Sequence, residues 1–301
     1  MQEDPNWPRA SHWLAAKRDG ECALGVVGIP MNSSITPGRC DLAPGAIRKA
    51  LDRFSLYDSQ AGIDLGELSV RDFGDAVLLD GSSEEVFSRS VQAIKKAFAN
   101  SIAVVLFGGD NTITHAGIHA LNLPLARCGL ITFDAHHDLR DLAVGLTNGN
   151  PVRALLHDGL PGANIVQIGI QPFTNSPAYA RVAREAGITV VTVEEVYARG
   201  IDAAVSAALQ LLENKTEAIY VDLDVDVLDR AFAPACPGAR PGGLPPWMLK
   251  NASRICGAHR LVRVMDIVEI DPTRDIADCT TLAAASFFLA FASGLATRLR
   301  L

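Results

Sequence analysis

The stretch Cys128-Gly-Leu-Ile-Thr-Phe-Asp134-Ala-His-His-Asp138 joins an apolar run to a cluster of carboxylates and imidazoles. The apolar half predicts a buried strand, and the polar half begins where that strand ends. Alternate residues of an extended chain point to the same face, so we expect Asp134, His136 and Asp138 to converge on one cation. Carboxylate oxygens and imidazole nitrogens are common ligands of divalent metals. His137 points the other way, and we expect it to support the site or to face a substrate.

A second acidic segment, Asp222-Leu-Asp224-Val-Asp226, follows the apolar run Glu217-Ala-Ile-Tyr-Val. Alternate spacing pairs Asp224 with either Asp222 or Asp226, and spacing alone does not choose between them. Carboxylates this close raise one another's pKa unless a cation lies between them. Two strands that both end in acidic residues therefore predict a site for one or two divalent cations, and the alternative is a solvated loop.

Two further segments are less informative by themselves. Leu106-Phe-Gly-Gly-Asp-Asn111 closes a third apolar run, and Asn111 has an amide oxygen that a metal could take, but the sequence also fits an ordinary turn. Glu269 ends the run that begins at Leu261, where an acid could pair with a cationic substrate group or form a salt bridge. His115 is interpreted as a structural histidine on a helix and is left out of the site.

The rest of the chain alternates short apolar runs with longer helical patterns, which predicts an α/β fold with a mainly parallel sheet of roughly eight strands. In such sheets ligands bind beyond the carboxyl ends of the strands, where both acidic segments lie. No repeat or linker is evident, so residues 1–301 are predicted to form a single domain. The expected strands begin near Ala23, Leu68, Ile102, Cys128, Asn164, Ile188, Glu217 and Arg260, and helical patterns cover Ser83–Asn100, Pro177–Ala186 and Ala203–Leu212.

Composition narrows the class of partner and compartment. The 301 residues are 49% hydrophobic and 20% charged, with a net charge of −7 and no long Lys/Arg cluster, so neither nucleic acid nor an anionic membrane is an expected partner. The six cysteines are scattered without a CxxC pair, which predicts reduced thiols in a cytoplasmic protein. The N-terminus lacks the apolar core of a signal peptide. The apolar run from Leu282 to Leu295 is taken to be too short for a membrane span, so we predict a buried helix.

Taken together, these motifs resemble the ureohydrolase family, which includes arginase and agmatinase. The hallmark segments are Gly108-Gly-Asp-Asn111, Asp134-Ala-His-His-Asp138 and Asp224-Val-Asp226-Val-Leu-Asp229. Further matches occur in order along nearly the whole chain, at Gly38-Arg39, Pro44-Gly-Ala-Ile-Arg48, Phe232-Ala-Pro, Pro241-Gly-Gly and Asp266-Ile-Val-Glu269. The resemblance implies an arginase-like, three-layer α/β/α fold and a centre with two metal ions, usually Mn²⁺.

The resemblance also implies roles for these residues. Asp134 and Asp224 would bridge both ions, Asp138 with Asn111 would bind the first ion, and His136 with Asp226 would bind the second. This choice favours Asp226 over Asp222, which stands where the family tends to carry a small residue. Asp138 would relay a proton and Glu269 would orient cationic nitrogens of the substrate. The family pattern has His where this chain has Asn111, which predicts a weak first site because an amide oxygen replaces an imidazole.

Within the family, His136-His-Asp-Leu-Arg140 followed by Thr147-Asn-Gly-Asn-Pro-Val-Arg153 resembles the formimidoylglutamase branch. The expected substrate-binding residues are Arg140, Asn148, Asn150 and Glu269, because a guanidinium suits a substrate with carboxylates. The implied reaction is N-formimidoyl-L-glutamate plus water to L-glutamate plus formamide, a step of histidine degradation. The alternatives are another ureohydrolase, namely an agmatinase, guanidinobutyrase or arginase, or a metal-depleted relative that acts as a scaffold. The family also implies a homo-oligomer.

Overall fold

The computed structural model describes residues 4–16, 20–36, 38–78 and 82–300. Residues 1–3 and 301, the ends of the predicted domain, lie outside this description. Eight parallel strands form one sheet in the order β4-β1-β5-β10-β9-β6-β7-β8. All eight predicted strands are present, and the sheet is wholly rather than mainly parallel. Their bounds are β1 (Cys22–Ile29), β4 (Val70–Asp75), β5 (Ser101–Gly108), β6 (Cys128–Phe133), β7 (Ile165–Ile170), β8 (Thr189–Thr192), β9 (Ala218–Leu223) and β10 (Val262–Ile267).

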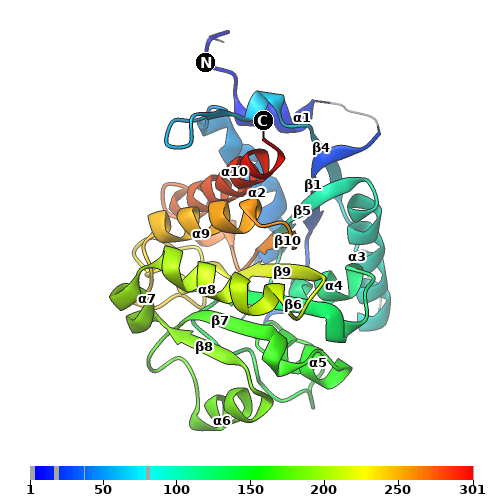
Figure 1. Cartoon of the computed structure of the whole chain (residues 1–301), viewed down its shortest axis with the longest axis vertical. Helices are drawn as coiled ribbons and strands as arrows, with labels where there is room; N and C mark the ends of the chain where they lie inside the picture. The colour runs from blue at the N-terminus through cyan, green and yellow to red at the C-terminus, as the bar shows by residue number, and fades with distance from the viewer. Residues whose placement is uncertain (1–3, 17–19, 37, 79–81, 301) are drawn as a thin grey trace.

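Helices cover both faces of the sheet, which confirms the predicted three-layer arrangement (Figure 1). One layer contains α1 (Ala10–Ala15), α2 (Ala43–Ala50), α7 (Val193–Arg199), α8 (Ile201–Glu213), α9 (Pro246–Ala258) and α10 (Cys279–Leu299). The other layer contains α3 (Ser83–Phe98), α4 (Ile113–Ala120), α5 (Pro151–Asp158) and α6 (Pro177–Ala186). The three predicted helical patterns correspond to α3, α6 and α8.

Smaller elements that the sequence did not suggest complete the described chain. A short antiparallel pair joins β2 (Tyr57–Asp58) to β3 (Ile63–Asp64). Single turns of 3₁₀-helix connect larger elements at η1 (Cys40–Leu42), η2 (Leu51–Arg53), η3 (Leu65–Glu67), η4 (Leu125–Arg127), η5 (Gly162–Asn164), η6 (Val225–Val227) and η7 (Pro272–Arg274).

Local sequence signals set several helix ends. Ser82 and Glu85 form a reciprocal capping box at the start of α3, which satisfies backbone N–H groups that have no partner within the helix. At α6, Ser176 caps the first turn, and Pro177 occupies a position where its missing N–H costs nothing. Gly187 ends the same helix in the left-handed conformation, at φ 79°.

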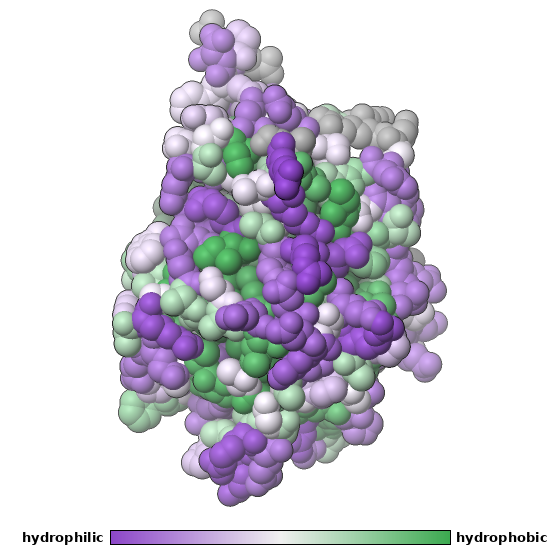
Figure 2. Space-filling view, in the orientation of Figure 1, coloured by the Kyte–Doolittle hydropathy of each residue, from purple (hydrophilic) through white to green (hydrophobic). Residues whose placement is uncertain are grey.

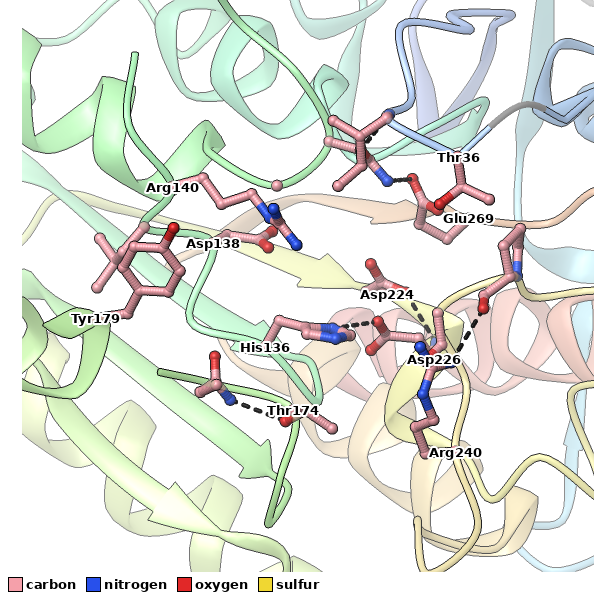
Figure 3. Close-up of a pocket in the computed structure, with 17 residues that line it drawn as sticks. Thr36, His136, Asp138, Arg140, Thr174, Tyr179, Asp224, Asp226, Arg240 and Glu269 are labelled. Atoms are coloured by element: carbon pink, nitrogen blue, oxygen red, sulfur yellow. Dashed lines mark hydrogen bonds and ion pairs between the residues drawn. The ribbon is translucent and has the colours of Figure 1, made fainter. Parts of the chain in front are cut away.

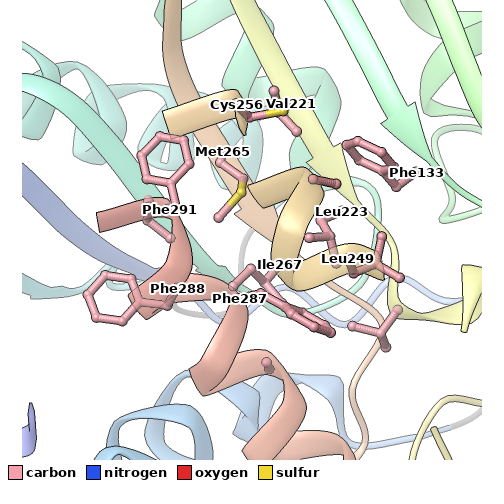
Figure 4. Close-up of a cluster of buried hydrophobic side chains, with 14 of the residues drawn as sticks. Phe133, Val221, Leu223, Leu249, Cys256, Met265, Ile267, Phe287, Phe288 and Phe291 are labelled. Carbon is pink, nitrogen blue, oxygen red and sulfur yellow. The ribbon is translucent and has the colours of Figure 1, made fainter. Parts of the chain in front are cut away.

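The largest hydrophobic cluster lies between the sheet and the layer that contains α9 and α10 (Figure 4). Phe287, Phe288 and Phe291 from α10 pack there with Phe133 and Ile267 from the strands. Every residue of β6 and β9 is buried, because both faces of these strands lie under helices. This double burial explains why the strands read as continuous apolar runs rather than as alternating patterns.

Helix α10 corrects one prediction and supports another. The run Leu282–Leu295 predicts a segment too short to cross a membrane. This prediction is wrong, because the helix is 21 residues long. Among the described residues it is the one helix with the length and composition of a membrane span. However, 78% of its most apolar window is buried inside the protein, as expected of a core helix. The face of the molecule in Figure 2 is mostly hydrophilic, with apolar residues in separate patches.

Candidate metal and substrate site

The candidate site residues follow four neighbouring strands at the centre of the sheet, β5, β10, β9 and β6. Asn111 lies three residues beyond β5, and Glu269 lies two residues beyond β10. Asp134 and Asp224 directly follow β6 and β9. Because the strands are parallel, these four segments meet at one edge of the sheet, as predicted.

The tightest group at this edge contains Asp134, His136 and Asp226, whose ligand atoms lie within 4.8 Å of one another. Figure 3 shows His136 pointing toward Asp226. His136 Nδ1 lies 2.6 Å from Asp226 Oδ2 and 3.5 Å from Asp134 Oδ1. Asp134 Oδ2 is buried and has no hydrogen-bond partner among the described residues. Two carboxylates and one imidazole therefore lie together, and Asp134, which has the unpaired oxygen, lies beneath the pocket lining formed by His136 and Asp226.

Backbone hydrogen bonds hold these carboxylates in place. The N–H of Ala135 donates to Asp226 Oδ1 over 2.9 Å, which ties the β6 loop to the β9 loop. The N–H of Asp226 donates to Asp224 Oδ1 over 2.8 Å and begins the turn η6. Gly238 packs against the same carboxylate, since a Cβ there would lie 2.6 Å from Asp226 Oδ2. The close approach of the 237–239 loop to Asp226 thus requires a glycine.

A second group joins Asp138, Asn111 and Glu269. Asn111 Nδ2 donates to Asp138 Oδ2 over 2.6 Å, and the N–H of Asn111 donates to Glu269 Oε1 over 2.9 Å. Asn111 Oδ1 accepts from the hydroxyl of Thr114 over 2.9 Å. Asp138 and Glu269 have φ values of 52° and 66°, a conformation that is rare for residues with a side chain and often marks functional sites. In this arrangement Asn111 holds Asp138, and its amide must turn over before the oxygen can ligate a metal.

Electrostatics at the strand ends are strongly unbalanced toward negative charge. Burial, and then repulsion by Asp226, raises the pKa of Asp134 to about 7. Burial and neighbouring carboxylates also raise the pKa values of Asp138 and Asp224 well above their usual range. Burial, followed by repulsion from Asp110, raises the pKa of Glu269 to about 8.

His136 is the one described residue whose cationic form this acidic cluster clearly favours. The negative charge of Asp226 is the largest cause that raises the pKa of His136. Burial of Asp226 tends to raise its pKa, but the nearby positive charge of His136 outweighs burial and holds this pKa below its usual value. One imidazole does not balance these five buried carboxylates, because desolvated anions need a nearby positive charge. The unpaired Asp134 oxygen and this charge imbalance fit a centre that holds divalent cations.

A pocket of about 140 Å³ opens over these carboxylates. Arg140 and Arg240 both line it, on opposite sides of the acidic group in Figure 3. Sequence reasoning found Arg140 but missed Arg240, which directly precedes the Pro241-Gly-Gly family match. It also missed other lining residues that no motif marks, namely Ile35, Thr36, Thr174, Asn175, Tyr179 and Pro237.

Arg240 is held by the loop that carries it. Its Nη1 donates to the carbonyl oxygens of Pro237, Gly238 and Ala239 over 2.9–3.2 Å. This leaves the guanidinium fixed at the pocket wall, where it is positioned by backbone rather than by a carboxylate. The pocket therefore combines an acidic floor with two cationic groups on its walls.

The two candidate asparagines of the 147–150 loop differ in position. Asn148 lines the pocket, donates to Glu269 Oε1 over 3.2 Å, and accepts from the N–H of Ile35. Asn150 is fully buried, and its side chain bonds the backbone of Asp141, Gly145 and Thr147. The structure therefore places Asn150 in the support of the loop and not at the substrate, because its polar atoms are already occupied by backbone groups.

His137 and Asp266 also have structural positions. His137 Nδ1 lies 2.7 Å from Gln167 Oε1, and its N–H donates to Asn175, so it supports the loop from behind. Asp266 lies within β10 and accepts from the Tyr220 hydroxyl over 2.6 Å.

Asp222 is fully buried beneath the site, and neither of its carboxylate oxygens has a hydrogen-bond partner among the described residues. It is absent from the residues that line the pocket, whereas Asp224 and Asp226 both line it. The structure thus favours the second of the two pairs that the alternate spacing allowed.

The fold and this acidic centre define the class of protein. A model of the arginase family matches residues 22–293, and the chain belongs to this family. The chain is 38% identical over 287 residues to a formimidoylglutamase of Halalkalibacterium halodurans, which covers 94% of this chain and 89% of the relative. The predicted resemblance to the ureohydrolase family, and to its formimidoylglutamase branch, is confirmed.

Solved structures give the same result. The fold matches that of formimidoylglutamase from Bacillus subtilis with a TM-score of 0.92 and 30% identity, over 98% of this chain and 94% of the other. It also matches Trypanosoma cruzi formiminoglutamase with Mn²⁺, with a TM-score of 0.88 over 97% and 99% of the two chains. At 23% identity, this second match supports the fold alone.

Proposed function

We propose that this protein is a manganese-dependent hydrolase that converts N-formimidoyl-L-glutamate and water to L-glutamate and formamide. The observation that carries the proposal is the pocket itself, in which buried carboxylates and His136 lie beneath two arginines. An acidic floor suits divalent cations and an amidine, and arginines suit a substrate with two carboxylates. Relatives named formimidoylglutamase, and a Mn²⁺ complex of one of them, support the same reading.

The metal ligands of the proposal keep the roles that the family resemblance implies. Asp134 and Asp224 would hold both ions, Asp138 the first, and His136 with Asp226 the second. When bound, two cations would lower the pKa of a water molecule and supply a nucleophile near neutral pH. Asn111 would be either a weak ligand of the first ion or a hydrogen-bond donor that positions Asp138, and its present contacts favour the donor role.

The substrate would lie between the acidic floor and the arginines. Glu269, held by Asn111 and Asn148, would accept hydrogen bonds from the amidine nitrogens. Arg140 would bind one carboxylate, and Arg240 is a candidate for the other. Glu269 lines the pocket together with both arginines, so one extended molecule can meet all three groups.

The bond changes follow from this placement. The water oxygen bonds to the formimidoyl carbon, and the bond from that carbon to the α-nitrogen of glutamate breaks. Asp138 would take the proton of the attacking water and pass it to the departing amine.

A substrate panel with added Mn²⁺ tests the proposal against other ureohydrolases. We expect hydrolysis of N-formimidoyl-L-glutamate to exceed that of arginine, agmatine and guanidinobutyrate. Arg140→Ala should raise KM by about 10-fold or more with little change in kcat, because a charge-assisted hydrogen bond is worth about 1.5–3 kcal/mol. Arg199→Ala, an exposed arginine on α7, is the matched control. Efficient hydrolysis of agmatine, which has no carboxylate, would overturn the substrate assignment.

The second candidate class is a metal-depleted relative that acts as a scaffold. His136, Asp138, Asp224 and Asp226 line one pocket, and Asp134 lies beside His136 and Asp226, which favours the enzyme. Protein that neither binds Mn²⁺ nor hydrolyses any compound of the panel would favour the scaffold instead.

The setting of the enzyme is part of the proposal. We propose a cytoplasmic protein that forms one domain over residues 1–301, assembles as a homo-oligomer, and takes a small amidine as its partner. The scattered and mostly buried cysteines suit a reducing compartment. The continuous eight-stranded sheet supports one domain. The oligomer rests on family resemblance, and gel filtration with light scattering would test it.

A further inference from the structure

A second cluster of metal-binding side chains lies outside the strand-end centre, between α4 and α5. His115 and His119 are four residues apart on α4, so they share one face of the helix. Asp158 is the last residue of α5. His115 Nε2 and His119 Nε2 lie 2.7 Å and 2.9 Å from the same oxygen, Asp158 Oδ2. The two nitrogens and the carboxylate oxygen lie within 4.8 Å of one another.

This geometry also suits a small cation. Both imidazole nitrogens converge on one oxygen of Asp158, so three ligand atoms already surround one point. His115 Nδ1 is buried and has no hydrogen-bond partner among the described residues. A divalent ion between the two Nε2 atoms and the carboxylate would take all three ligands at once. His115 Nδ1 has no hydrogen-bond partner among the described residues, so ion binding does not break a hydrogen bond at this atom.

The rings are also held in place before any ion binds. Phe87 on α3 packs against both histidines, with ring centroids 5.0 Å from His115 and 5.5 Å from His119. Packing of this kind lowers the conformational entropy that the side chains lose on binding.

The cluster remains open to solvent on its Asp158 side. The side chain of Asp158 is 31% exposed, and that of His119 is 29% exposed. His157, which is 77% exposed, has its Nδ1 3.4 Å from Asp158 Oδ1. A bound ion could therefore take a water molecule or His157 as its fourth ligand. Three protein ligands with one open position is a common arrangement for Zn²⁺.

We propose that His115, His119 and Asp158 form a second, peripheral site for a borderline divalent cation such as Zn²⁺. The two imidazoles distinguish it from the strand-end centre, whose oxygen-rich set suits Mn²⁺. The ion would tie α4 to α5. Helix α4 begins just after Asn111, and α5 begins just after the loop that carries Asn148, so the tie would brace two segments that position Glu269.

Zn²⁺ binding to protein preloaded with Mn²⁺ tests this site. Equilibrium dialysis with metal analysis should show that the parent takes about one equivalent of Zn²⁺ more than His119→Ala. Zn²⁺ that exchanges into the strand-end centre cancels in this difference, because both proteins share that centre. Zn²⁺ should also raise the Tm of the parent by more than it changes the Tm of the variant. His12→Ala, an exposed histidine on α1, should behave as the parent does.

Asp158→Asn is the second variant, since it keeps the size of the side chain and serves if His119→Ala does not fold. It should also lose the additional equivalent, because a neutral amide is a weaker ligand than a carboxylate. Equal Zn²⁺ stoichiometry and equal Tm shifts in the parent and the folded variants would overturn the proposal.

Discussion

At the residue scale, Asn111 is where this chain departs from the family pattern, and its surroundings make the departure testable. The amide donates to Asp138 and accepts from Thr114, so both of its polar ends are already engaged. To ligate a metal, the oxygen must exchange these contacts for a weaker bond than imidazole would give. The first metal site is therefore expected to be the weaker of the two.

Titration of metal-free protein with Mn²⁺ should show two unequal binding steps, with activity following the weaker step. Asn111→His should tighten that step by about 10-fold, the size of change typical when the direct surroundings of a metal are altered. Activity at limiting Mn²⁺ should rise with it. Isothermal titration calorimetry and a rate assay at matched Mn²⁺ concentrations measure both effects. Two equal and tight steps in the parent, with no gain in the variant, would contradict a weak first site.

His136 and Asp226 are the second pair to test, because their side chains lie 2.6 Å apart at the centre of the acidic group. His136→Ala and Asp226→Ala should each lower activity by at least about 100-fold and reduce bound Mn²⁺. The control is His12→Ala, which removes an exposed imidazole that is distant in sequence from His136 and Asp226. Metal analysis and the hydrolysis assay give the two readouts. Normal turnover at normal metal content in either variant would show that the site is misassigned.

The sequence could predict that Asp134 and Asp224 lie at one edge of the sheet but not every residue of the pocket, and the physical reasons differ. Asp134 and Asp224 directly follow buried strands, so strand geometry aims both at this edge. The choice of Asp226 over Asp222 rested on the family resemblance. Arg240 lies in a loop whose path depends on backbone bonds to its own guanidinium, which no periodic pattern records. Asn150 shows the opposite case, because its residue type suits substrate binding while the loop backbone uses its side chain.

At the element scale, the strands were predictable because burial on both faces leaves an unbroken apolar run. The pair β2–β3 was not predictable, because a strand of two residues is too short to show an alternating pattern. The length of α10 was underestimated because its first turn contains Thr280 and Thr281, which a count of apolar residues excludes although both are buried.

The edge strand β4 depends on one arginine for its attachment to α2. Arg48 donates from Nε and Nη2 to both carboxylate oxygens of Asp72, over 2.7 Å and 2.9 Å, and from Nη1 to Asp75. The guanidinium also lies over the ring of Phe107, 5.7 Å from its centroid. These groups are mostly shielded, since the side chains of Arg48 and Asp72 are 22% and 21% exposed.

Arg48→Met should therefore lower the free energy of unfolding by about 1.5–3 kcal/mol, the usual loss for charge-assisted hydrogen bonds. Methionine keeps much of the aliphatic stem, so the loss reports mainly on the guanidinium. The control is Arg260→Met, whose pair with Glu213 is 65% and 36% exposed and should contribute only about 0–1 kcal/mol. Urea unfolding of the two variants measures the difference. Equal losses would mean that the Arg48 pair does not anchor β4.

At the scale of the whole molecule, the order of strands is what creates the site. β5, β10, β9 and β6 are neighbours in the sheet although Asn111 and Glu269 are far apart in sequence. Each apolar run predicted a strand, but the order in which strands pair depends on how helices of both layers pack. The sequence therefore predicted the strands and the three layers but not the order of the strands, which the structure gives.

The same burial that builds the sheet also determines which thiols can react. Five of the six cysteines are buried, and Cys279, the first residue of α10, is exposed. Burial raises the pKa of Cys128 to about 11 and that of Cys256 to about 12, so few of these thiols are ionised at pH 8. Since the thiolate is the reactive form, access and ionisation both protect the interior cysteines.

With DTNB at pH 8 and Mn²⁺ present, we therefore expect one thiol per chain to react quickly and the remaining five to react after denaturant is added. Cys279→Ser should abolish the fast phase and leave the denatured total one lower. The release of thionitrobenzoate over time gives both the rate and the count. A second thiol that reacts as fast as Cys279 in the folded parent would show that the packing around an interior cysteine opens in solution. Peptide mapping of the labelled chain would then identify which strand or helix has moved.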